Sequence, residues 1–295
     1  MKFYIVTPTF NSLGWLERAV RSVADQSGQG VEVHHHVQDG GSTDGTAAWL
    51  EAWQREHADK PGYTFTYVSE KDAGMYDALN KAWDAMPADA DVTAHLNSDE
   101  QYLPDAFQGI AEGFASHPSA DIILSSHFVL DAQDRYICHR WPVTPQKWVS
   151  RCVCEIITCA CFHKASIFRR HGIRFDTRWR SIGDLVLYRD IMETSPNVVA
   201  LADVFTTSFT VTGSNLGWSE VTDREWVTLL AEMSSAARIC RRIAGLWCNL
   251  KRRSKDCIHR APRTYAVYPA GSAVREEHAI KHPTSHWGCR TEGEQ

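Results

Sequence analysis

The first hundred residues alternate short apolar runs with segments of helical periodicity, and this alternation constrains the fold more than any other feature. Apolar runs at residues 3–6, 31–37, 63–68 and 92–96 predict four strands. Segments 13–23, 47–53 and 73–86 predict the helices between them. Strands that alternate with helices predict an α/β fold with a doubly wound, mostly parallel sheet.

Polar clusters follow three of these strands. Asp39 follows the second strand, residues 70–72 follow the third, and residues 97–100 follow the fourth. Open α/β sheets bind ligands at the carboxyl ends of their strands. We therefore expect the three clusters to share one binding site.

Each cluster also has a purely structural interpretation. Asp39 could belong to a turn in which Ser42 or Thr43 caps the next helix. Asp72 could complement a helix dipole, and residues 97–100 could form a polar turn before Pro104. The convergence of all three favours a site over these separate alternatives.

The cluster at residues 97–100 also indicates a cation site. Asp99 offers a carboxylate and Asn97 an amide oxygen. Hard divalent cations such as Mg²⁺ or Mn²⁺ prefer oxygen ligands and often keep substrate phosphates among them.

Four motifs in order resemble the family 2 inverting glycosyltransferases, which have a GT-A fold. They cover roughly the first third of the chain and read TPTFN from residue 7, QDGGSTDGT from 38, KDAGMYDALNK from 71 and LNSDE from 96. The resemblance implies that Asp39 and Asp72 contact the nucleotide and that Asp99 binds Mg²⁺ or Mn²⁺. Asn97 stands where the family has the first Asp of its Asp-x-Asp motif. The full set of expected nucleotide-sugar-binding residues is Thr7, Pro8, Thr9, Asn11, Asp39, Gly40, Asp72, Asn97, Ser98 and Asp99.

The second half resembles the acceptor side of such enzymes more loosely. The matching stretches are residues 162–164, 172–176 and 181–184. The resemblance places the catalytic general base at Asp184, where Gly183 replaces the usual preceding Glu. Asp176 and Asp190 are the alternatives. Residues 209–214 resemble a loop that closes near the donor diphosphate.

The function implied is sugar transfer, with inversion, from a nucleotide-diphospho-sugar to a hydroxyl of a sugar or lipid-linked acceptor. Cell-surface polysaccharide or glycolipid assembly is the expected setting. One rival is a nucleotidyltransferase, which would want a Gly-rich loop with Lys or Arg after the first strand, and residues 7–13 have neither Lys nor Arg. The other rival is an inert nucleotide-sugar-binding protein.

We expect a glycosyltransferase domain at residues 1–218, divided into a nucleotide-binding half at 1–100 and an acceptor half at 101–218. Residues 219–295 form a helical, basic extension in which apolar residues trace a helical stripe from Trp226 to Leu250. Segment 238–263 carries nine Lys/Arg and one acid, a local charge of about +8 against about −13 elsewhere. This segment is either a solvated face or a contact for an anionic membrane surface.

Composition bounds the remaining alternatives. The net charge of −5 argues against a nucleic-acid partner. The amino-terminal residues lack a signal-peptide pattern, so the expected location is cytoplasmic. The basic segment adds the expectation of a peripheral contact with the inner face of the membrane. Residues 288–295 are expected to fray.

Two further patterns resemble metal sites but have simpler interpretations. The tract His34–His36 is expected at the surface or at a sheet edge. Buried packing is expected for the cysteines, because the single-residue spacing of Cys152, Cys154, Cys159 and Cys161 is unlike that of zinc ligands.

Overall fold

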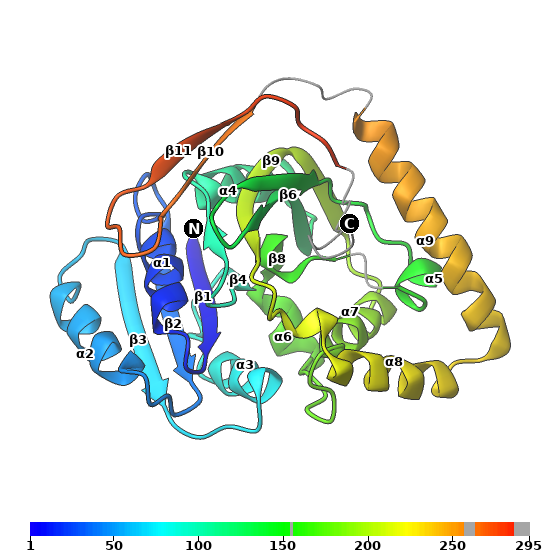
Figure 1. Ribbon diagram of the computed structural model, residues 1–295, viewed down its shortest axis with the longest axis horizontal. Helices are drawn as coiled ribbons and strands as arrows, with labels where there is room; N and C mark the ends of the chain where they lie inside the picture. The colour runs from blue at the N-terminus through cyan, green and yellow to red at the C-terminus, as the bar shows by residue number, and fades with distance from the viewer. Residues whose placement is uncertain (154–155, 257–262, 286–295) are drawn as a thin grey trace, which may run out of the picture.

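The computed structural model describes residues 1–153, 156–256 and 263–285 (Figure 1). Its first part follows the predicted alternation of strand and helix closely. In chain order the elements are β1 (Lys2–Thr9), α1 (Leu13–Ala24), β2 (Glu32–Asp39), α2 (Thr46–Glu56), β3 (Tyr63–Ser69), α3 (Met75–Asp84) and β4 (Val92–His95).

The middle of the chain is less regular, as its sequence indicates. Its elements are β5 (Gln101–Tyr102), α4 (Ala106–Ser116), β6 (Ile122–Asp131), β7 (Tyr136–Arg140), α5 (Lys147–Ser150), η1 (Thr158–Ala160), β8 (Cys161–Lys164), α6 (Ala165–His171), α7 (Gly183–Glu193) and β9 (Val198–Val211).

One curled sheet organises the molecule, with the described strands in the order β3-β2-β1-β4-β8-β6-β9-β5 and with β7 added beside β6. The strands β3, β2, β1 and β4 are all parallel. The short strand β8 is antiparallel to both β4 and β6, whereas β6 and β9 pair in parallel. The predicted α/β class is confirmed, and β8 is the antiparallel join between two parallel groups.

Helices cover both faces of this sheet, as a doubly wound fold requires. On one face, apolar side chains of α1, α2 and α4 enter a common core, represented by Leu16, Leu50 and Phe107. On the other face, α3, α6 and α7 form a second core with Tyr4 and Val6 of β1. Both faces of β1 are therefore buried, which explains its nearly continuous apolar sequence.

The histidine tract occupies the interior of the sheet, so the expected surface or edge position is wrong. It lies on β2, which has β1 on one side and β3 on the other. His35 is fully buried and bonds Thr7, whereas His34 and His36 both bond the Thr66 hydroxyl from the opposite face. Burial lowers the pKa of His35 to about 3, so this side chain is held neutral, and burial also lowers the pKa of His34 and His36.

The carboxyl-terminal part contains η2 (Leu216–Trp218), α8 (Glu220–Glu232) and α9 (Ser235–Asp256). The stripe from Trp226 to Leu250 is thus divided between two helices that break after Glu232. Figure 1 shows α9 along the outer edge of the molecule, on the side opposite α2. The domain boundary predicted near residue 218 falls between η2 and α8.

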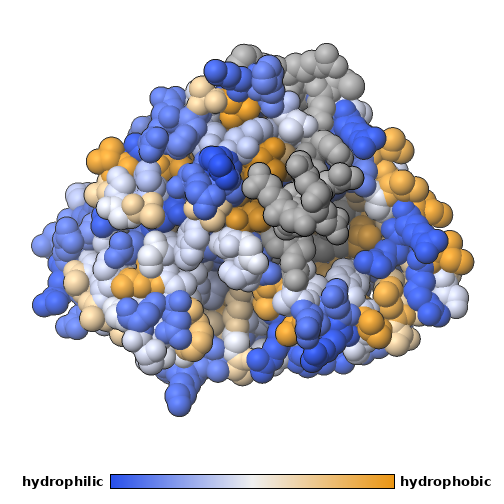
Figure 2. Space-filling model, viewed as in Figure 1, coloured by the Kyte–Doolittle hydropathy of each residue, from blue (hydrophilic) through white to orange (hydrophobic). Residues whose placement is uncertain are grey.

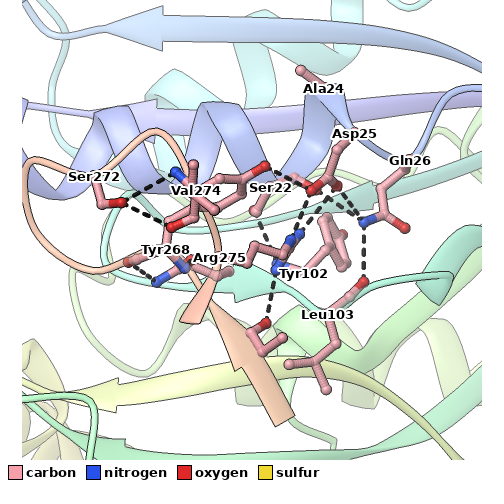
Figure 3. Close-up of polar contacts among 12 residues, drawn as sticks. Ser22, Ala24, Asp25, Gln26, Tyr102, Leu103, Tyr268, Ser272, Val274 and Arg275 are labelled. Carbon is pink, nitrogen blue, oxygen red and sulfur yellow. Dashed lines mark hydrogen bonds and ion pairs between the residues drawn. The ribbon is translucent and has the colours of Figure 1, made fainter. Parts of the chain in front are cut away.

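A hairpin of β10 (Arg263–Val267) and β11 (Glu276–Ile280) follows the helices and returns to the amino-terminal unit. Arg275 forms a two-pronged ion pair with Asp25 at 2.7 and 3.0 Å, and its guanidinium lies over the Tyr268 ring (Figure 3). Tyr268 exchanges two backbone hydrogen bonds with the Gln101 side chain and donates its hydroxyl to Asp25. The expected extension therefore also contains a strand pair that packs beside α1.

The cysteines behave as packing residues where the structure describes them. Cys152, Cys159 and Cys161 are buried thiols without disulfides, and Cys154 lies outside the described residues. Across residues 1–153, 156–256 and 263–285, no group of three or more His, Cys, Asp or Glu side chains is placed so that it could hold a metal ion. Over the same ranges, every helix is too short or too polar to cross a bilayer. The fraying expected at residues 288–295 lies outside this part of the chain.

Candidate active site

A cleft of about 990 Å³ opens at the carboxyl ends of the parallel strands. Five groups of residues meet there: the ends of β1 and β2, the segment between β3 and α3 with the start of α3, the end of β4 with the turn after it, residues 156–158, and the start of α7 together with the loop after β9. The polar residues of the lining are Thr9, Ser12, Lys71, Asp72, Tyr76, His95, Asn97, Ser98, Asp99, Glu100, Thr158, Arg180, Ser181, Asp184, Thr212, Ser214 and Asn215.

Most of the residues predicted from sequence line this cleft. Those predicted for the donor are Pro8, Thr9, Gly40, Asp72, Asn97, Ser98 and Asp99, and the predicted base Asp184 lines it as well. Residues Thr7, Asn11 and Asp39 are not in the lining.

Asp39 is buried behind the cleft wall, where its own neighbours use its oxygens. The carboxylate accepts hydrogen bonds from the Ser42 backbone and hydroxyl, and from the Ser69 hydroxyl at 2.5 Å. Asn11 bonds the same turn through its backbone N–H to Ser42 and its side-chain oxygen to the Thr43 N–H. These residues fix the loops that frame the cleft.

The capping interpretation of the Asp39 turn is wrong, because α2 begins at Thr46 with Gly45 as its N-cap. Asp44 accepts hydrogen bonds from the backbone and hydroxyl of Thr46 instead. Ser42 and Thr43 are thereby available for the contacts with Asp39 and Asn11.

Gly40 lets Asp72 approach the end of β2. A Cβ at position 40 would lie 2.8 Å from Asp72 Oδ2 and 3.3 Å from both Asp72 Cγ and a ring carbon of Phe10. The other carboxylate oxygen of Asp72 accepts a hydrogen bond from the Gly74 N–H at 2.8 Å. Any larger residue at position 40 would displace the Asp72 carboxylate.

A chain of hydroxyl groups joins β1 to the turn after β4. Thr9 Oγ1 lies 2.9 Å from Ser12 Oγ, which donates to Ser98 Oγ at 2.9 Å. Ser12 is the N-cap residue of α1, but its side chain makes no capping bond. The hydroxyl therefore serves the cleft rather than the helix end.

The turn after β4 brings together two carboxyl groups and an amide oxygen. The side-chain oxygen of Asn97 is buried and has no hydrogen-bond partner among the described residues, while its backbone N–H donates to Glu100 at 2.8 Å. Burial raises the pKa of Asp99. Burial and the neighbouring Asp99 charge raise the pKa of Glu100 to about 8. The Asp99 carboxylate and the Asn97 amide oxygen are ligands of the kind that a hard divalent cation takes.

Asn215 is a residue that sequence reasoning missed. Its amide nitrogen donates to Asp99 Oδ2 at 3.3 Å and to the Thr210 carbonyl, and its oxygen accepts from the Thr212 N–H. It therefore connects the loop after β9 to the turn after β4. The predicted loop at residues 209–214 stops one residue short of it, and only its position in that loop could have suggested it.

Asp184 lies in the first turn of α7, facing the cleft. Its Oδ1 accepts a hydrogen bond from the Leu185 N–H at 2.8 Å, and burial raises its pKa to about 6. A carboxylate with a pKa near neutrality can accept a proton from a hydroxyl group and release it to water. The geometry thus suits a general base.

Gly183 has a structural reason to replace the expected Glu. A Cβ there would lie 2.5 to 2.9 Å from three carbons of the Tyr76 ring. Tyr76 donates its hydroxyl to the Ser181 carbonyl and accepts from the Asp184 N–H. The ring therefore packs directly against the backbone that carries Asp184.

The alternative bases lie elsewhere. Asp176 pairs with Arg178 at 2.7 Å and Asp190 lies 3.4 Å from Arg189, and neither carboxylate lines the cleft.

Cationic groups are available at the cleft itself. Lys71 and Arg180 line it, and neither makes an ion pair with any residue in the described ranges.

With this geometry established, comparison with known proteins identifies the family. The model of glycosyl transferase family 2 matches residues 4–172, more than half of the chain. The chain belongs to glycosyl transferase family 2. This match confirms the resemblance to family 2 glycosyltransferases that the four sequence motifs indicated.

Its relatives by sequence are described only in general terms. Two proteins from Mycobacterium tuberculosis, strains CDC 1551 / Oshkosh and ATCC 25618 / H37Rv, are each described as an uncharacterized glycosyltransferase. Each is 39% identical over 77 residues, and the match covers 26% of this chain and 26% of the relative. The chain thus spans about a quarter of the length of these relatives.

Solved structures show that this family 2 protein has a GT-A fold. Residues 1–349 of S. aureus TarS in complex with UDP-GlcNAc align with a TM-score of 0.58 at 16% identity, covering 78% of this chain and 64% of that one. The mannosyltransferase PcManGT from Pyrobaculum calidifontis, in complex with GDP-Man and Mn²⁺, gives 0.58 at 17%, covering 84% and 70%.

Proposed function

We propose that this family 2 glycosyltransferase moves a sugar from a nucleotide-diphospho-sugar to an acceptor hydroxyl with inversion, using Asp184 as general base. The observation that carries the proposal is that Asp184 shares one cleft of about 990 Å³ with Asp72, Asn97 and Asp99. Asp72 and Asp184 lie more than a hundred residues apart in sequence, and each of the four residues was expected at a sugar-transfer site.

The donor is proposed to lie along the carboxyl ends of β1, β2 and β4. Support comes from the solved structures of the same fold, which are complexes with UDP-GlcNAc, UDP and GDP-Man. In this chain, the hydroxyls of Thr9, Ser12 and Ser98 offer hydrogen bonds to polar donor groups. Lys71 and Arg180 offer positive charge for a diphosphate. Asp39 is assigned the role of fixing the base-side loop from behind, because Ser42 and Ser69 use its oxygens.

A divalent cation fits the turn after β4. Asp99 would hold it through a carboxylate oxygen and Asn97 through the amide oxygen that lacks a partner. Mg²⁺ and Mn²⁺ are the proposed ions, and Mn²⁺ is bound in the mannosyltransferase neighbour. When bound, the cation would stabilise negative charge on the leaving diphosphate as a Lewis acid.

Asp184 has one carboxylate oxygen available for the acceptor. Oδ1 accepts the Leu185 N–H, while Oδ2 makes no hydrogen bond with any residue in the described ranges. Oδ2 would take the proton from the acceptor hydroxyl as that oxygen attacks the anomeric carbon, and the nucleoside diphosphate leaves from the opposite face. General-base catalysis of this kind contributes roughly 10²- to 10⁴-fold in rate. One displacement inverts the anomeric centre, and no covalent intermediate with the protein is needed.

The acceptor is proposed to be a sugar or a lipid-linked precursor in cell-surface polysaccharide or glycolipid assembly. Its hydroxyl would enter beside Arg180 and Ser181, which line the cleft next to Asp184. The inert-binder alternative keeps the donor contacts but predicts no turnover. The nucleotidyltransferase alternative gains no support from the end of β1 and the residue after it, because the cleft residues Pro8, Thr9 and Phe10 carry no positive charge.

Two linked measurements test the proposal. The first is a thermal-shift screen of nucleotide-sugars, each with and without Mn²⁺. A ligand that binds only the folded state stabilises it by about 2.7 kcal/mol at a hundredfold excess over its dissociation constant. The second is release of nucleoside diphosphate from the stabilising donor when candidate acceptors are added. Stabilisation followed by acceptor-dependent release supports transfer, whereas stabilisation without release under any acceptor supports the inert binder.

A further inference from the structure

The outward face of α9 is apolar although the helix already packs against its own domain through the opposite face. Ala244 and Cys248 are buried against Val149 and Cys152 of the α5 region. A surface helix packed in this way normally presents polar residues to solvent. On α9, the outward positions carry large apolar side chains instead, namely Ile239 (65% exposed), Ile243 (56%), Leu246 (66%) and Leu250 (67%).

These four residues form one continuous stripe. They are spaced four, three and four residues apart, so at 3.6 residues per turn they lie within about 60° of one another around the helix axis. Figure 2 shows hydrophobic residues along the outer edge of the molecule over α9, interspersed with strongly hydrophilic ones. Scattered single apolar residues on a surface are ordinary, but a stripe of four on one helix face indicates a contact surface.

Positive charge borders the stripe. The helix carries seven Lys/Arg and one acid. Arg242 and Arg253 fall beside the stripe on one flank, Lys251 lies on the other flank beyond Trp247, and none of the three pairs with an acid in the described ranges. The chain as a whole is negative at −5, so this concentration of positive charge is a local feature. An apolar stripe edged with arginine and lysine is the pattern of a helix that lies in the headgroup region of an anionic bilayer.

We propose that α9 docks this protein on an anionic membrane surface, with Ile239, Ile243, Leu246 and Leu250 inserted among the lipids and Arg242, Lys251 and Arg253 at the headgroups. The charge of the helix favours anionic lipid over a second copy of this net-negative chain, whose own α9 would present the same positive charges. Residues 214–217, which line the cleft, lead through η2 directly into α8 and then α9.

Vesicle flotation tests the proposal independently of sugar transfer. The wild-type protein is mixed with two kinds of vesicle. One contains phosphatidylcholine alone, and in the other about one third of the lipid is phosphatidylglycerol. We expect flotation with the anionic vesicles only, and loss of most binding in about 1 M salt, where the Debye length falls to roughly 3 Å. The double variant Ile243→Glu/Leu246→Glu should lower vesicle partitioning at least roughly a hundredfold, because each inserted apolar side chain contributes about tenfold or more.

A matched control separates this face from general surface hydrophobicity. Val274 is 73% exposed and lies between β10 and β11, so Val274→Glu should float like wild type. Thermal melting of each variant establishes that it folds. Equal flotation of the double variant and wild type, or no flotation of wild type on anionic vesicles at low salt, would overturn the proposal. A wild-type dimer that the double variant converts to a monomer, without vesicle binding by either, would instead assign the face to a second copy and also overturn it.

Discussion

The contact between Gly183 and Tyr76 provides a quantitative test of how the proposed base is positioned. In Gly183→Ala, the new Cβ would lie 2.5, 2.8 and 2.9 Å from three carbons of the Tyr76 ring. Carbon atoms in contact prefer about 3.5 to 4.0 Å, so the ring or the start of α7 must move by roughly 1 Å.

The Tyr76 ring has little freedom to move. It is 4% exposed, it stacks on Phe175 at 4.5 Å between ring centres, and its hydroxyl bonds the Ser181 carbonyl at 2.8 Å. The start of α7 is therefore expected to shift and to carry Asp184 with it. Overpacking of this kind costs about 1 to 3 kcal/mol of folding free energy. Misplacing a catalytic group by about 1 Å costs roughly a hundredfold in rate.

The assay is kcat/KM for transfer, with donor affinity measured in parallel. Gly183→Ala should lose about a hundredfold in kcat/KM while its donor dissociation constant stays near wild type, because most of the proposed donor contacts lie at the carboxyl ends of β1, β2 and β4, outside α7. Gly14→Ala is the matched control, since a Cβ there meets nothing within 4 Å. Transfer by Gly183→Ala at the wild-type rate would refute the argument that Tyr76 and Gly183 set the position of Asp184.

Three further predictions follow from contacts described above. The pKa of Asp184 is raised to about 6, and only its ionised form accepts a proton, so kcat/KM should fall as pH drops through 6, by about tenfold for each further unit. A pH–rate profile without this acid limb would contradict the assignment. Asp99→Ala should abolish the extra thermal stabilisation that Mn²⁺ adds to a donor, because Asn97 alone offers no charge. The cation-site proposal fails if the metal effect on melting is unchanged in that variant. Arg275→Ala removes the bonds to Asp25 from a side chain that is 13% exposed, and it should lower the free energy of unfolding by about 1 to 3 kcal/mol without changing donor affinity. Urea unfolding measures this effect, and an unchanged midpoint would show that the β10–β11 hairpin does not depend on the pair.

Local patterns carried the prediction of the first half of the fold. Each of β1 to β4 is a short apolar or alternating run bounded by turn residues, and the polar residues that follow them meet because the strands are parallel. Such signals lie within a few residues of one another, so a single sequence reveals them. The surface position expected for His34–His36 failed because nothing in the tract indicates that β3 will cover its outer side.

Long-range partners could not be predicted in the same way. Asp39 accepts a hydrogen bond from Ser69, thirty residues away, and is not in the cleft lining. Asn215 reaches Asp99 across 116 residues, and Arg275 reaches Asp25 across 250. These contacts are set by how the sheet curls and where the chain returns, and no periodicity or spacing encodes them. The predicted base Asp184 rested on resemblance, and its neighbours Gly183 and Tyr76 acquire their meaning only in the structure.

Asp184 is proposed to act as the general base in a cleft whose binding of the donor does not depend on the Asp184 carboxylate. The most direct measurement compares wild type with Asp184→Asn, a change that keeps the size of the side chain and removes its basicity. We expect donor-dependent thermal stabilisation to be retained in Asp184→Asn, while transfer falls by at least about a hundredfold. Equal transfer by the two proteins would contradict the claim and require another base.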